Sequence, residues 1–291
     1  MRDQPDFRYA FRYALQKRGF IVEIELPNGS ISAITCGEGH PILIMHGGGL
    51  DHRHMHDALE PVFEGLSGWQ RVYIDLPGHG ASLVDDSVNC QDDVLNMIST
   101  FANKAFEGRR FAVIGESRGS YHAMGLVRTR PKDIIGMMLV VADGMPGATV
   151  DWRPKHQTLV PLSKQVTVSA SQEARARFER LVVQNSDILD KIELTKVPAT
   201  KLTDQKLAER IRSNFNFSFD LSEPPAPFEE PCLIVNGRQD AMAGYQDMMD
   251  GIKNYPRATM AILDCAGHSL AWEQPELFKA LTVNWLSRMK Q

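Results

Sequence analysis

Cysteine is scarce in this sequence, and long apolar runs are missing. The 291 residues include four scattered cysteines, Cys36, Cys90, Cys232 and Cys265, without a C-x-x-C pair. This spacing indicates neither a disulfide framework nor a zinc site, so we expect reduced thiols in a cytoplasmic protein. No apolar run approaches the roughly 18 residues that a membrane helix needs. The first twenty residues carry charges throughout, and we therefore expect no signal peptide.

An excess of positive charge is also lacking. The formal net charge of -4 argues against a general affinity for nucleic acid or for an anionic membrane. A hydrophobic content of 43% and a charged content of 23% are typical of a globular protein with a sizeable core. We expect a small-molecule substrate, with no nucleic-acid or membrane partner, and the sequence leaves a homodimer open.

Short apolar runs, most of them ending in a glycine-containing loop, recur along the chain. The runs at 20–26 and 31–36 flank a Pro-Asn-Gly turn and predict an antiparallel hairpin. Six further runs are typical of strands buried on both faces: PILIM, RVYIDL, RFAVIG, IIGMMLVV, CLIVNG and ATMAIL. Helical patterns at 91–106, 120–130 and 274–289 separate several of them. The sequence thus predicts an α/β fold with a mostly parallel eight-stranded sheet, an N-terminal hairpin and helices on both faces.

One interval interrupts this alternation. Residues 147–226 contain no buried strand, but they contain helical patterns at 171–185 and 204–215 and close on a proline-rich stretch. Their Leu, Val and Phe content favours an inserted helical cap over a disordered loop. We therefore expect a core formed by 1–146 and 227–291, with the cap inserted between them.

The predicted strand at 111–116 runs into Gly-Glu-Ser-Arg-Gly-Ser, and a helical pattern follows. In a strand–turn–helix context, G-x-S-x-G indicates a serine nucleophile, here Ser117. We expect strained backbone angles at Ser117, with Gly115 and Gly119 required because side chains there would collide across the turn. The alternative is an ordinary helix N-cap serine.

A serine hydroxyl is a poor nucleophile without a base. Among nine histidines, His268 falls between the last predicted strand and the last helix, so it should reach the same sheet edge. Asp240 ends the preceding strand and gives the chain order Ser, Asp, His. Asp143 is the alternative acid at the end of a neighbouring strand, and Asp264 is a weaker one.

Negative charge that develops on a carbonyl oxygen needs preorganised donors. The run HGGG at 46–49 offers backbone N–H groups without side chains, and we predict Gly48 and Arg118 as the oxyanion donors. A merely flexible glycine turn is the alternative. The side chains of Glu116 and Arg118 could pair with each other or with neighbouring loops, and Arg118 could instead bind a substrate carboxylate.

Together these motifs resemble the α/β-hydrolase superfamily, in its capped esterase, lactonase and C–C hydrolase branch. The segments that carry the resemblance are HGGG, DLPGHGAS, GESRGS, NGRQD and GHSLAWEQPE, in the family's order. They span almost the whole chain outside the expected cap. The resemblance implies a mainly parallel sheet, a catalytic triad and an acyl-serine intermediate that water hydrolyses.

Departures from individual subgroups leave the substrate open. A serine nucleophile disfavours epoxide hydrolases and haloalkane dehalogenases, which carry Asp there. Meta-cleavage C–C hydrolases usually have Trp directly after the catalytic His, whereas Ser269 follows here. We predict a serine hydrolase that acts on an ester, lactone or thioester of a small, moderately apolar molecule. C–C bond hydrolysis on the same triad is the alternative, followed by a non-catalytic ligand receptor and a metal-dependent hydrolase.

The metal-dependent alternative rests on LDHRHMHD at 50–57, which resembles the H-x-H-x-D-H loop of some metallo-hydrolases. The order differs, because Asp57 follows the third histidine directly. If the segment opens a helix, only His52 and His56 share a face, and His54 does not. We therefore expect neither a metal nor a cofactor.

Overall fold

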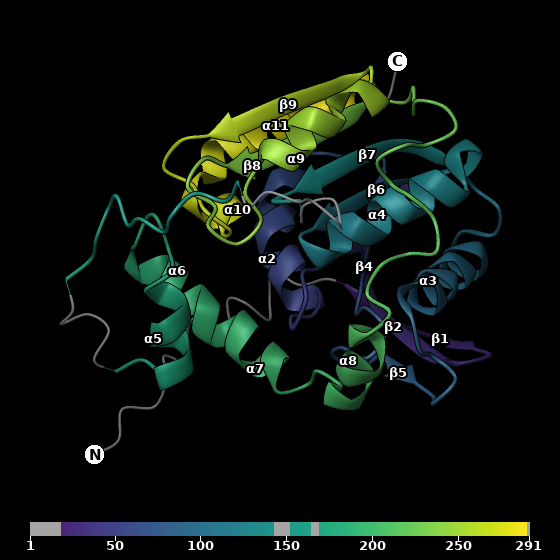
Figure 1. The fold of residues 1–291 in the computed structure, drawn as a ribbon, viewed down its shortest axis with the longest axis horizontal. Coiled ribbons are helices and arrows are strands. Elements are labelled where there is room, and N and C mark those ends of the chain that lie inside the picture. The colour runs from purple at the N-terminus through teal and green to yellow at the C-terminus, as the bar shows by residue number, and fades with distance from the viewer. Residues whose placement is uncertain (1–18, 143–151, 164–168, 290–291) are drawn as a thin grey trace.

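The computed structural model describes residues 19–142, 152–163 and 169–289 (Figure 1). At its centre lies a nine-stranded sheet in the order β1-β2-β4-β3-β6-β7-β8-β9, with β5 paired to β2. The strands are β1 Phe20–Leu26, β2 Gly29–Cys36, β3 His40–Met45, β4 Trp69–Ile74, β5 Leu83–Val84, β6 Phe111–Glu116, β7 Ile134–Val140, β8 Cys232–Gly237 and β9 Ala258–Leu263. The eight predicted strands are all present. The additional strand, β5, has two residues and is too short to give a sequence pattern.

The sheet is antiparallel at one end and parallel elsewhere. β1 and β2 form the expected hairpin, and β2 also pairs antiparallel with β4. From β4 through β3, β6, β7 and β8 to β9, every neighbouring pair is parallel. All six residues of β6 are buried, which explains its continuous apolar character, because helices cover a parallel sheet on both faces. The predicted α/β fold class is confirmed.

Four long helices cover the two faces of the sheet (Figure 1). α2, His52–Phe63, and α11, Pro275–Arg288, pack on one face, where Leu59 and Trp285 are fully buried. α3, Gln91–Phe106, and α4, Arg118–Thr129, pack on the other, in a core that includes Ile98 and Phe101. The pattern at 91–106 matches α3, whereas α4 begins two residues earlier than predicted.

A helical segment stands between β7 and β8, here called the 172–212 helices. Its parts are α5 Gln172–Phe178, α6 Ser186–Lys191, a π-helical turn Ile192–Lys196, α7 Val197–Thr200 and α8 Gln205–Arg212. Within the described part of 152–231, the β pairing is limited to one isolated bridge between Val160 and Val183. The predicted helix at 171–185 is wrong in its length, because it ends at Phe178 and a second helix begins after Asn185, whose side chain accepts a hydrogen bond from the backbone N–H of Ile188.

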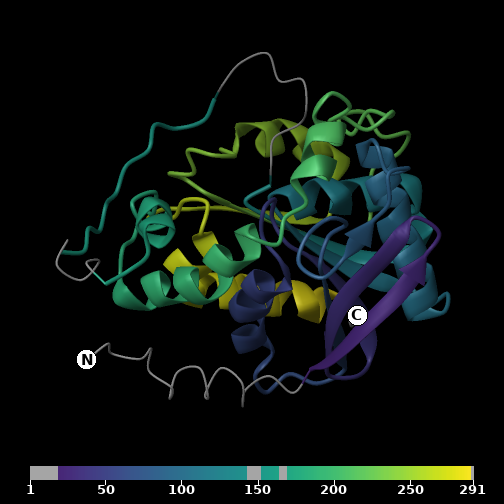
Figure 2. The same cartoon turned by 90° about the horizontal axis from the view of Figure 1, so that it is seen from below.

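Of the 172–212 helices, α5, α6 and α7 lie beyond the carboxyl ends of the strands, away from the β1–β2 hairpin (Figures 1 and 2). α8 lies beside β5, where Arg210 donates to the carbonyls of Asp85 and Val88 (Figure 1). Phe178, Ile188 and Ile192 form a small apolar cluster with Ala58 of α2 and Trp272 of α10, Leu270–Glu273. This cluster fixes the segment against the body of the molecule. None of the helices in the described ranges combines the length and the apolar character that a membrane span requires.

Candidate active site

Ser117 occupies a sharp turn between β6 and α4. Its φ of 50° and ψ of -113° are sterically unfavourable for a residue with a side chain, so the predicted strain is confirmed. The Ser117 N–H donates to the carbonyl of Val140 at 3.0 Å, which ties the turn to the neighbouring strand. Strain of this kind persists only where surrounding contacts enforce it.

The two glycines around Ser117 are needed for different reasons. A Cβ at position 115 would lie 2.2 Å from the carbonyl oxygen of Gly119, a collision across the turn as predicted. A Cβ at position 119 would instead lie 2.3 Å from the carbonyl oxygen of Met45, at the end of β3. Gly119 is therefore required, but the predicted reason is wrong, because the atom that a Cβ there would meet belongs to β3 and not to the turn. The sequence could not show this, since it does not state that β3 and β6 are adjacent.

His268 and Asp240 form a hydrogen-bonded pair at the same sheet edge. Asp240 follows β8 and is fully buried, and His268 lies in the loop between β9 and α10. His268 Nδ1 lies 2.9 Å from Asp240 Oδ2. The other oxygen, Oδ1, accepts the backbone N–H groups of Met242 at 2.8 Å and Ala243 at 3.1 Å. The carboxylate is thus held in one orientation with both oxygens engaged.

The two alternative acids have different outcomes. Asp264 is exposed and accepts a hydrogen bond from Gln239 Nε2 at 2.6 Å, so it does not form the hydrogen bond to His268 that Asp240 forms. Asp143 lies outside the described residues.

The environment of His268 favours its protonated form. Burial alone would lower the pKa of His268, but the charge and hydrogen bond of Asp240, with a further contribution from Glu116, raise it above 6.5. An imidazole in this setting accepts a proton readily and is stabilised once it has done so.

Ser117, His268 and Asp240 line one cavity of about 430 Å³. Gly48 and Arg118 line it as well, and on the far side the walls come from the 172–212 helices. The structure therefore brings together all five residues predicted for the site. A cavity of this volume lies in the range that small-molecule sites occupy.

The glycine loop next to this cavity is anchored by the buried His46 and the partly buried His79. His46 Nε2 accepts the N–H of Leu76 at 2.9 Å, and His79 Nε2 accepts the N–H of Gly49 at 3.2 Å. Burial lowers the pKa of His46 to about 4, which keeps the ring neutral and able to accept. His122 is also buried, and burial lowers its pKa to about 3.

The side chains that flank Ser117 do not pair with each other. Glu116 Oε2 lies 3.0 Å from His54 Nε2 of α2, and both side chains are buried. Burial would raise the pKa of Glu116, but His54, by charge and hydrogen bond, and Lys196 lower it to about 2, so a carboxylate persists beneath the nucleophile. The guanidinium of Arg118 lies 3.8 Å from the centre of the Phe215 ring, beside a second cavity of about 290 Å³.

Two residues of this site were missed by sequence reasoning. Glu273 accepts the N–H of Gly267, just before His268, at 2.6 Å, and also that of Val182 at 2.6 Å. Lys196, in the π-helical turn, donates from Nζ to Ser269 Oγ at 3.1 Å. The contacts of Glu273 with Val182 and of Lys196 with Ser269 join segments more than 70 residues apart, and no local pattern predicts them.

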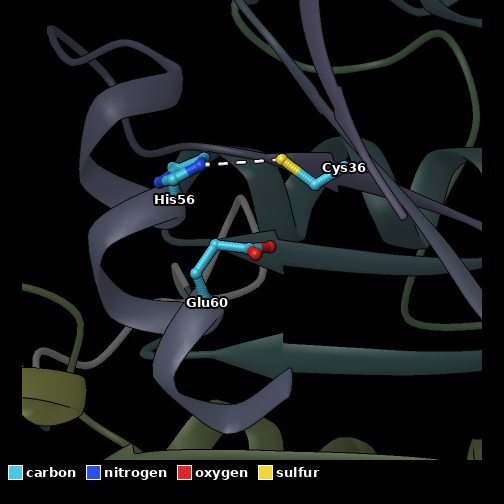
Figure 3. A group of neighbouring side chains, drawn as sticks. All are labelled: Cys36, His56 and Glu60. Atoms are coloured by element: carbon cyan, nitrogen blue, oxygen red, sulfur yellow. Dashed lines mark hydrogen bonds between the residues drawn. The ribbon is translucent and has the colours of Figure 1, made fainter. Parts of the chain in front are cut away.

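The three histidines of α2 point to three different partners. His52 Nδ1 lies 2.7 Å from Asp75 Oδ1, whereas His54 contacts Glu116 as described above. His56 Nε2 lies 3.7 Å from Cys36 Sγ (Figure 3). The structure therefore does not gather these histidines into a common set of metal ligands, although His52 and His56 are one helical turn apart.

Two groups of potential ligands do form around these histidines. One is Asp51, His52 and Asp75, and the other is Cys36, His56 and Glu60 (Figure 3). In the second group the Glu60 carboxylate accepts from Arg71 at 2.7 and 3.0 Å and from Tyr73 at 2.6 Å. An adjacent guanidinium opposes the binding of a cation, so these residues suit an internal ion pair better than a metal.

The fold and this arrangement of Ser, His and Asp define the class of protein. The model of the alpha/beta hydrolase family matches residues 42–281, and the chain belongs to that family.

Among curated proteins, the chain is 28% identical over 261 residues to the pimeloyl-(acyl-carrier protein) methyl ester esterase of Nitrosomonas europaea, covering 86% of this chain and 96% of the esterase. It is 21% identical over 260 residues to a 2-hydroxy-6-oxononadienedioate/2-hydroxy-6-oxononatrienedioate hydrolase of Pseudomonas putida, covering 86% and 89%. Its fold is similar to an alpha/beta superfamily hydrolase of Oenococcus oeni, with a TM-score of 0.83, 24% identity and 93% and 100% of the two chains covered.

Proposed function

We propose that this protein is a serine hydrolase that cleaves an ester, lactone or thioester of a small, moderately apolar molecule. The observation that carries the proposal is one cavity lined by a strained serine and by a histidine held at 2.9 Å by a buried carboxylate. Membership of the alpha/beta hydrolase family and relatives named as an esterase and a hydrolase support the same reaction type.

In the proposed mechanism, Ser117 Oγ attacks the carbonyl carbon and His268 accepts the serine proton. Asp240 holds the Nδ1–H of the imidazole and stabilises the imidazolium that forms. The backbone N–H groups of Gly48 and Arg118 hold the oxyanion. His268 then protonates the leaving group, and an acyl-serine remains. Water, deprotonated by the same histidine, hydrolyses the acyl-serine and restores the hydroxyl.

The 172–212 helices have a separate part in the proposal. We assign residues 147–226 to a cap over the cavity and residues 1–146 and 227–291 to the core. In support, Leu181, Ile192 and Lys196 line the cavity opposite Ser117. A cap that supplies six of the eighteen residues lining the cavity selects the substrate, while the core performs the chemistry.

The direct test is the variant Ser117→Ala, measured with 4-nitrophenyl acetate. We expect kcat/KM to fall by a factor on the order of 10⁴ or more, because the covalent route is lost. A fluorophosphonate should label Ser117 in the unmodified protein and leave the variant unlabelled. Ser213→Ala, at an exposed serine outside the cavity, is the matched control. Equal activity of Ser117→Ala and the unmodified protein would exclude the proposal.

C–C bond hydrolysis on the same three residues is the second candidate. The similarity to the Pseudomonas putida dienedioate hydrolase favours it. A panel of vinylogous 1,5-diketones and short esters, assayed side by side, separates the two: the proposed function predicts faster turnover of the esters.

A further inference from the structure

The cavity beside Ser117 carries an excess of positive charge. Its ionisable lining, histidines aside, consists of Arg118, Arg177, Arg180, Lys196, Glu116 and Asp240. The two carboxylates already have partners, since Glu116 contacts His54 and Asp240 contacts His268. Three of the cations come from the 172–212 helices rather than from the sheet. The side of the cavity that faces the nucleophile is therefore cationic.

Lys196 is the most deeply placed of these cations, with a side chain that is almost fully buried. Its ammonium donates to Ser269 Oγ and lies 4.7 Å from the centre of the Trp272 ring. Burial lowers the pKa of Lys196, the carboxylates of Glu116 and Glu273 oppose that effect, and Arg177 and Arg180 lower it further. Its direct contacts, a hydroxyl and a ring face, are neutral, and the ammonium has three donors, so it has capacity for an anion.

Local backbone geometry directs Lys196 into the cavity. Residues Ile192–Lys196 form a π-helical turn, in which the N–H of Val197 donates to the carbonyl of Ile192. Pro198 follows and has no N–H, so an ordinary helical hydrogen bond cannot form at that position. Ile192 and Lys196 both line the cavity as a result. π-helical turns of this type occur frequently at functional sites.

Arg177 brings a guanidinium to the same wall. One terminal nitrogen donates to Thr200 Oγ1 at 2.6 Å and lies 3.4 Å from Glu173 Oε1, whose side chain is one-third exposed. No residue in the described ranges accepts a hydrogen bond from its buried Nε–H. A buried donor without a partner is uncommon in a folded protein and calls for a specific explanation. Arg180, which is exposed, adds a third cation at the rim.

The three cations on this wall repel one another, since Arg177 and Arg180 both act against the charge of Lys196, and an anion bound between them would offset that repulsion. We infer that this wall is a subsite for a carboxylate on the substrate, with Lys196 and Arg177 as its principal ligands and Arg180 at its rim. The inference rests on the proposed serine hydrolase function and narrows it: the substrate is an ester, lactone or thioester that also carries a free carboxylate. A guanidinium and an ammonium together match the two oxygens of such a group.

Arg118, the cation next to the nucleophile, does not belong to this subsite. Its guanidinium stacks on Phe215 at 3.8 Å, at the boundary with the 290 Å³ cavity. The carboxylate subsite is therefore on the helical wall and not beside the serine, where a substrate anion would oppose the developing oxyanion.

The test compares two esters that differ in one charge. The anionic ester is mono-4-nitrophenyl glutarate, and the neutral one is 4-nitrophenyl methyl glutarate, with release of 4-nitrophenolate as the readout. We expect the unmodified protein to prefer the anionic ester by about tenfold or more in kcat/KM, since charge-assisted hydrogen bonds are worth at least that factor. Lys196→Met and Arg177→Met should each abolish most of this preference.

Two further variants keep the test decisive if a buried variant folds poorly. Arg180→Gln changes an exposed residue and should lower the preference by a smaller factor. The matched control is Arg175→Met, which lies on α5 with Arg177 but outside the cavity lining. It should leave the ratio of the two kcat/KM values unchanged. Fluorophosphonate labelling of Ser117 in each variant checks that the catalytic residues remain in place.

The outcomes separate the subsite from the function. If the unmodified protein hydrolyses both esters equally well, or if Lys196→Met is labelled at Ser117 and keeps the preference, the subsite is excluded and the hydrolase function stands. If neither ester is hydrolysed and Ser117 is not labelled, both proposals fail. The 4-nitrophenyl ester of 4-phosphonobutanoic acid carries a phosphonate in place of the glutarate carboxylate. If the protein prefers this ester to mono-4-nitrophenyl glutarate, the subsite binds a phosphate-like group and the assignment to a carboxylate is overturned.

Discussion

Arginine side chains line one cavity at the amino ends of the parallel strands and another at the carboxyl ends, but the contacts of these side chains differ between the two ends. At the amino ends, a depression of about 860 Å³ is lined by Arg109, Arg110, Arg257 and Arg288. Arg110 donates to the carbonyls of Lys132 and Ile134, and Arg288 donates to those of Cys232 and Arg257. The guanidinium groups of Arg110 and Arg288 are thus engaged in hydrogen bonds to backbone carbonyls of the protein itself. Because Arg110 and Arg288 are already engaged with backbone carbonyls, the size and charge of this hollow do not by themselves make it a binding site.

The carboxyl ends of the strands differ from the amino ends in that several residues there have strained backbone angles. Of the four described non-glycine residues with positive φ, Ser117, Val141 and Cys265 follow β6, β7 and β9. The fourth, Glu107, ends helix α3 in the ordinary left-handed cap conformation. A positive φ at a β-branched residue such as Val141 is rare. Backbone strain concentrated at one edge of a sheet is typical of a functional edge.

Asp240→Asn gives the largest effect expected from this comparison. The amide cannot hold the imidazole in the required tautomer or stabilise its protonated form, so kcat should fall by about 10⁴-fold. Steady-state hydrolysis of 4-nitrophenyl acetate measures this. A change in an acidic residue of the amino end, Glu230→Gln, should have no comparable effect, and a similar loss in both variants would contradict the difference between the two ends.

Gly119→Ala tests the packing of the strained turn against β3. Its Cβ would lie 2.3 Å from the Met45 carbonyl oxygen, so the free energy of unfolding should fall by roughly 2–4 kcal/mol. Urea denaturation measures the change. Gly251→Ala is the control, because a Cβ at that position meets nothing within 4 Å. Equal stability of the two variants would show that β3 can move away from the turn.

Arg288→Met probes the amino end. The loss of hydrogen bonds to the carbonyls of Cys232 and Arg257 should lower the free energy of unfolding by about 1–2 kcal/mol. The kcat/KM for 4-nitrophenyl acetate should not change, because the residue lies at the far end of the strands. A loss of activity without a loss of stability would mean that the two ends are coupled.

The smallest effects concern the pH profile of the carboxyl end. His268 acts as a base only when it is neutral, and its pKa is raised above 6.5, so kcat/KM should fall as pH drops through that raised value. Glu116 raises the pKa of His268 and Lys196 lowers it. With a neutral ester, Glu116→Gln should therefore move the acid limb to lower pH, and Lys196→Met should move it to higher pH.

The matched control for this pair is Glu209→Gln, at an exposed position on α8, which should leave the limb in place. If Glu116→Gln and Lys196→Met moved the acid limb in the same direction, the two charges would not have opposite effects on the pKa of His268, and the prediction would be wrong.

The sequence predicted the fold and the carboxyl-end motifs well, for a physical reason. Each strand of a parallel sheet ends at the same edge, so Ser117, Asp240 and His268 were placed together by topology alone. The helix after Asn185 was missed because its apolar residues pack on Trp272, which is distant in sequence. Lys196 was missed for the same reason, since its partner Ser269 lies 73 residues away. Contacts between the helices and the sheet are encoded in three dimensions, and no local period reports them.

The contacts of Glu273 limit how freely the inserted helices could be exchanged for those of another protein. A single carboxylate accepts N–H groups from the loop that carries His268 and from the 172–212 region, at Gly267 and Val182. Replacing the inserted helices by those of another family member, in order to graft a new specificity, would leave this carboxylate with one of its two anchors. Such a chimera should inherit a misplaced histidine along with its new pocket. Exchange would have to transfer residues 152–231 together with the 264–274 loop as one unit.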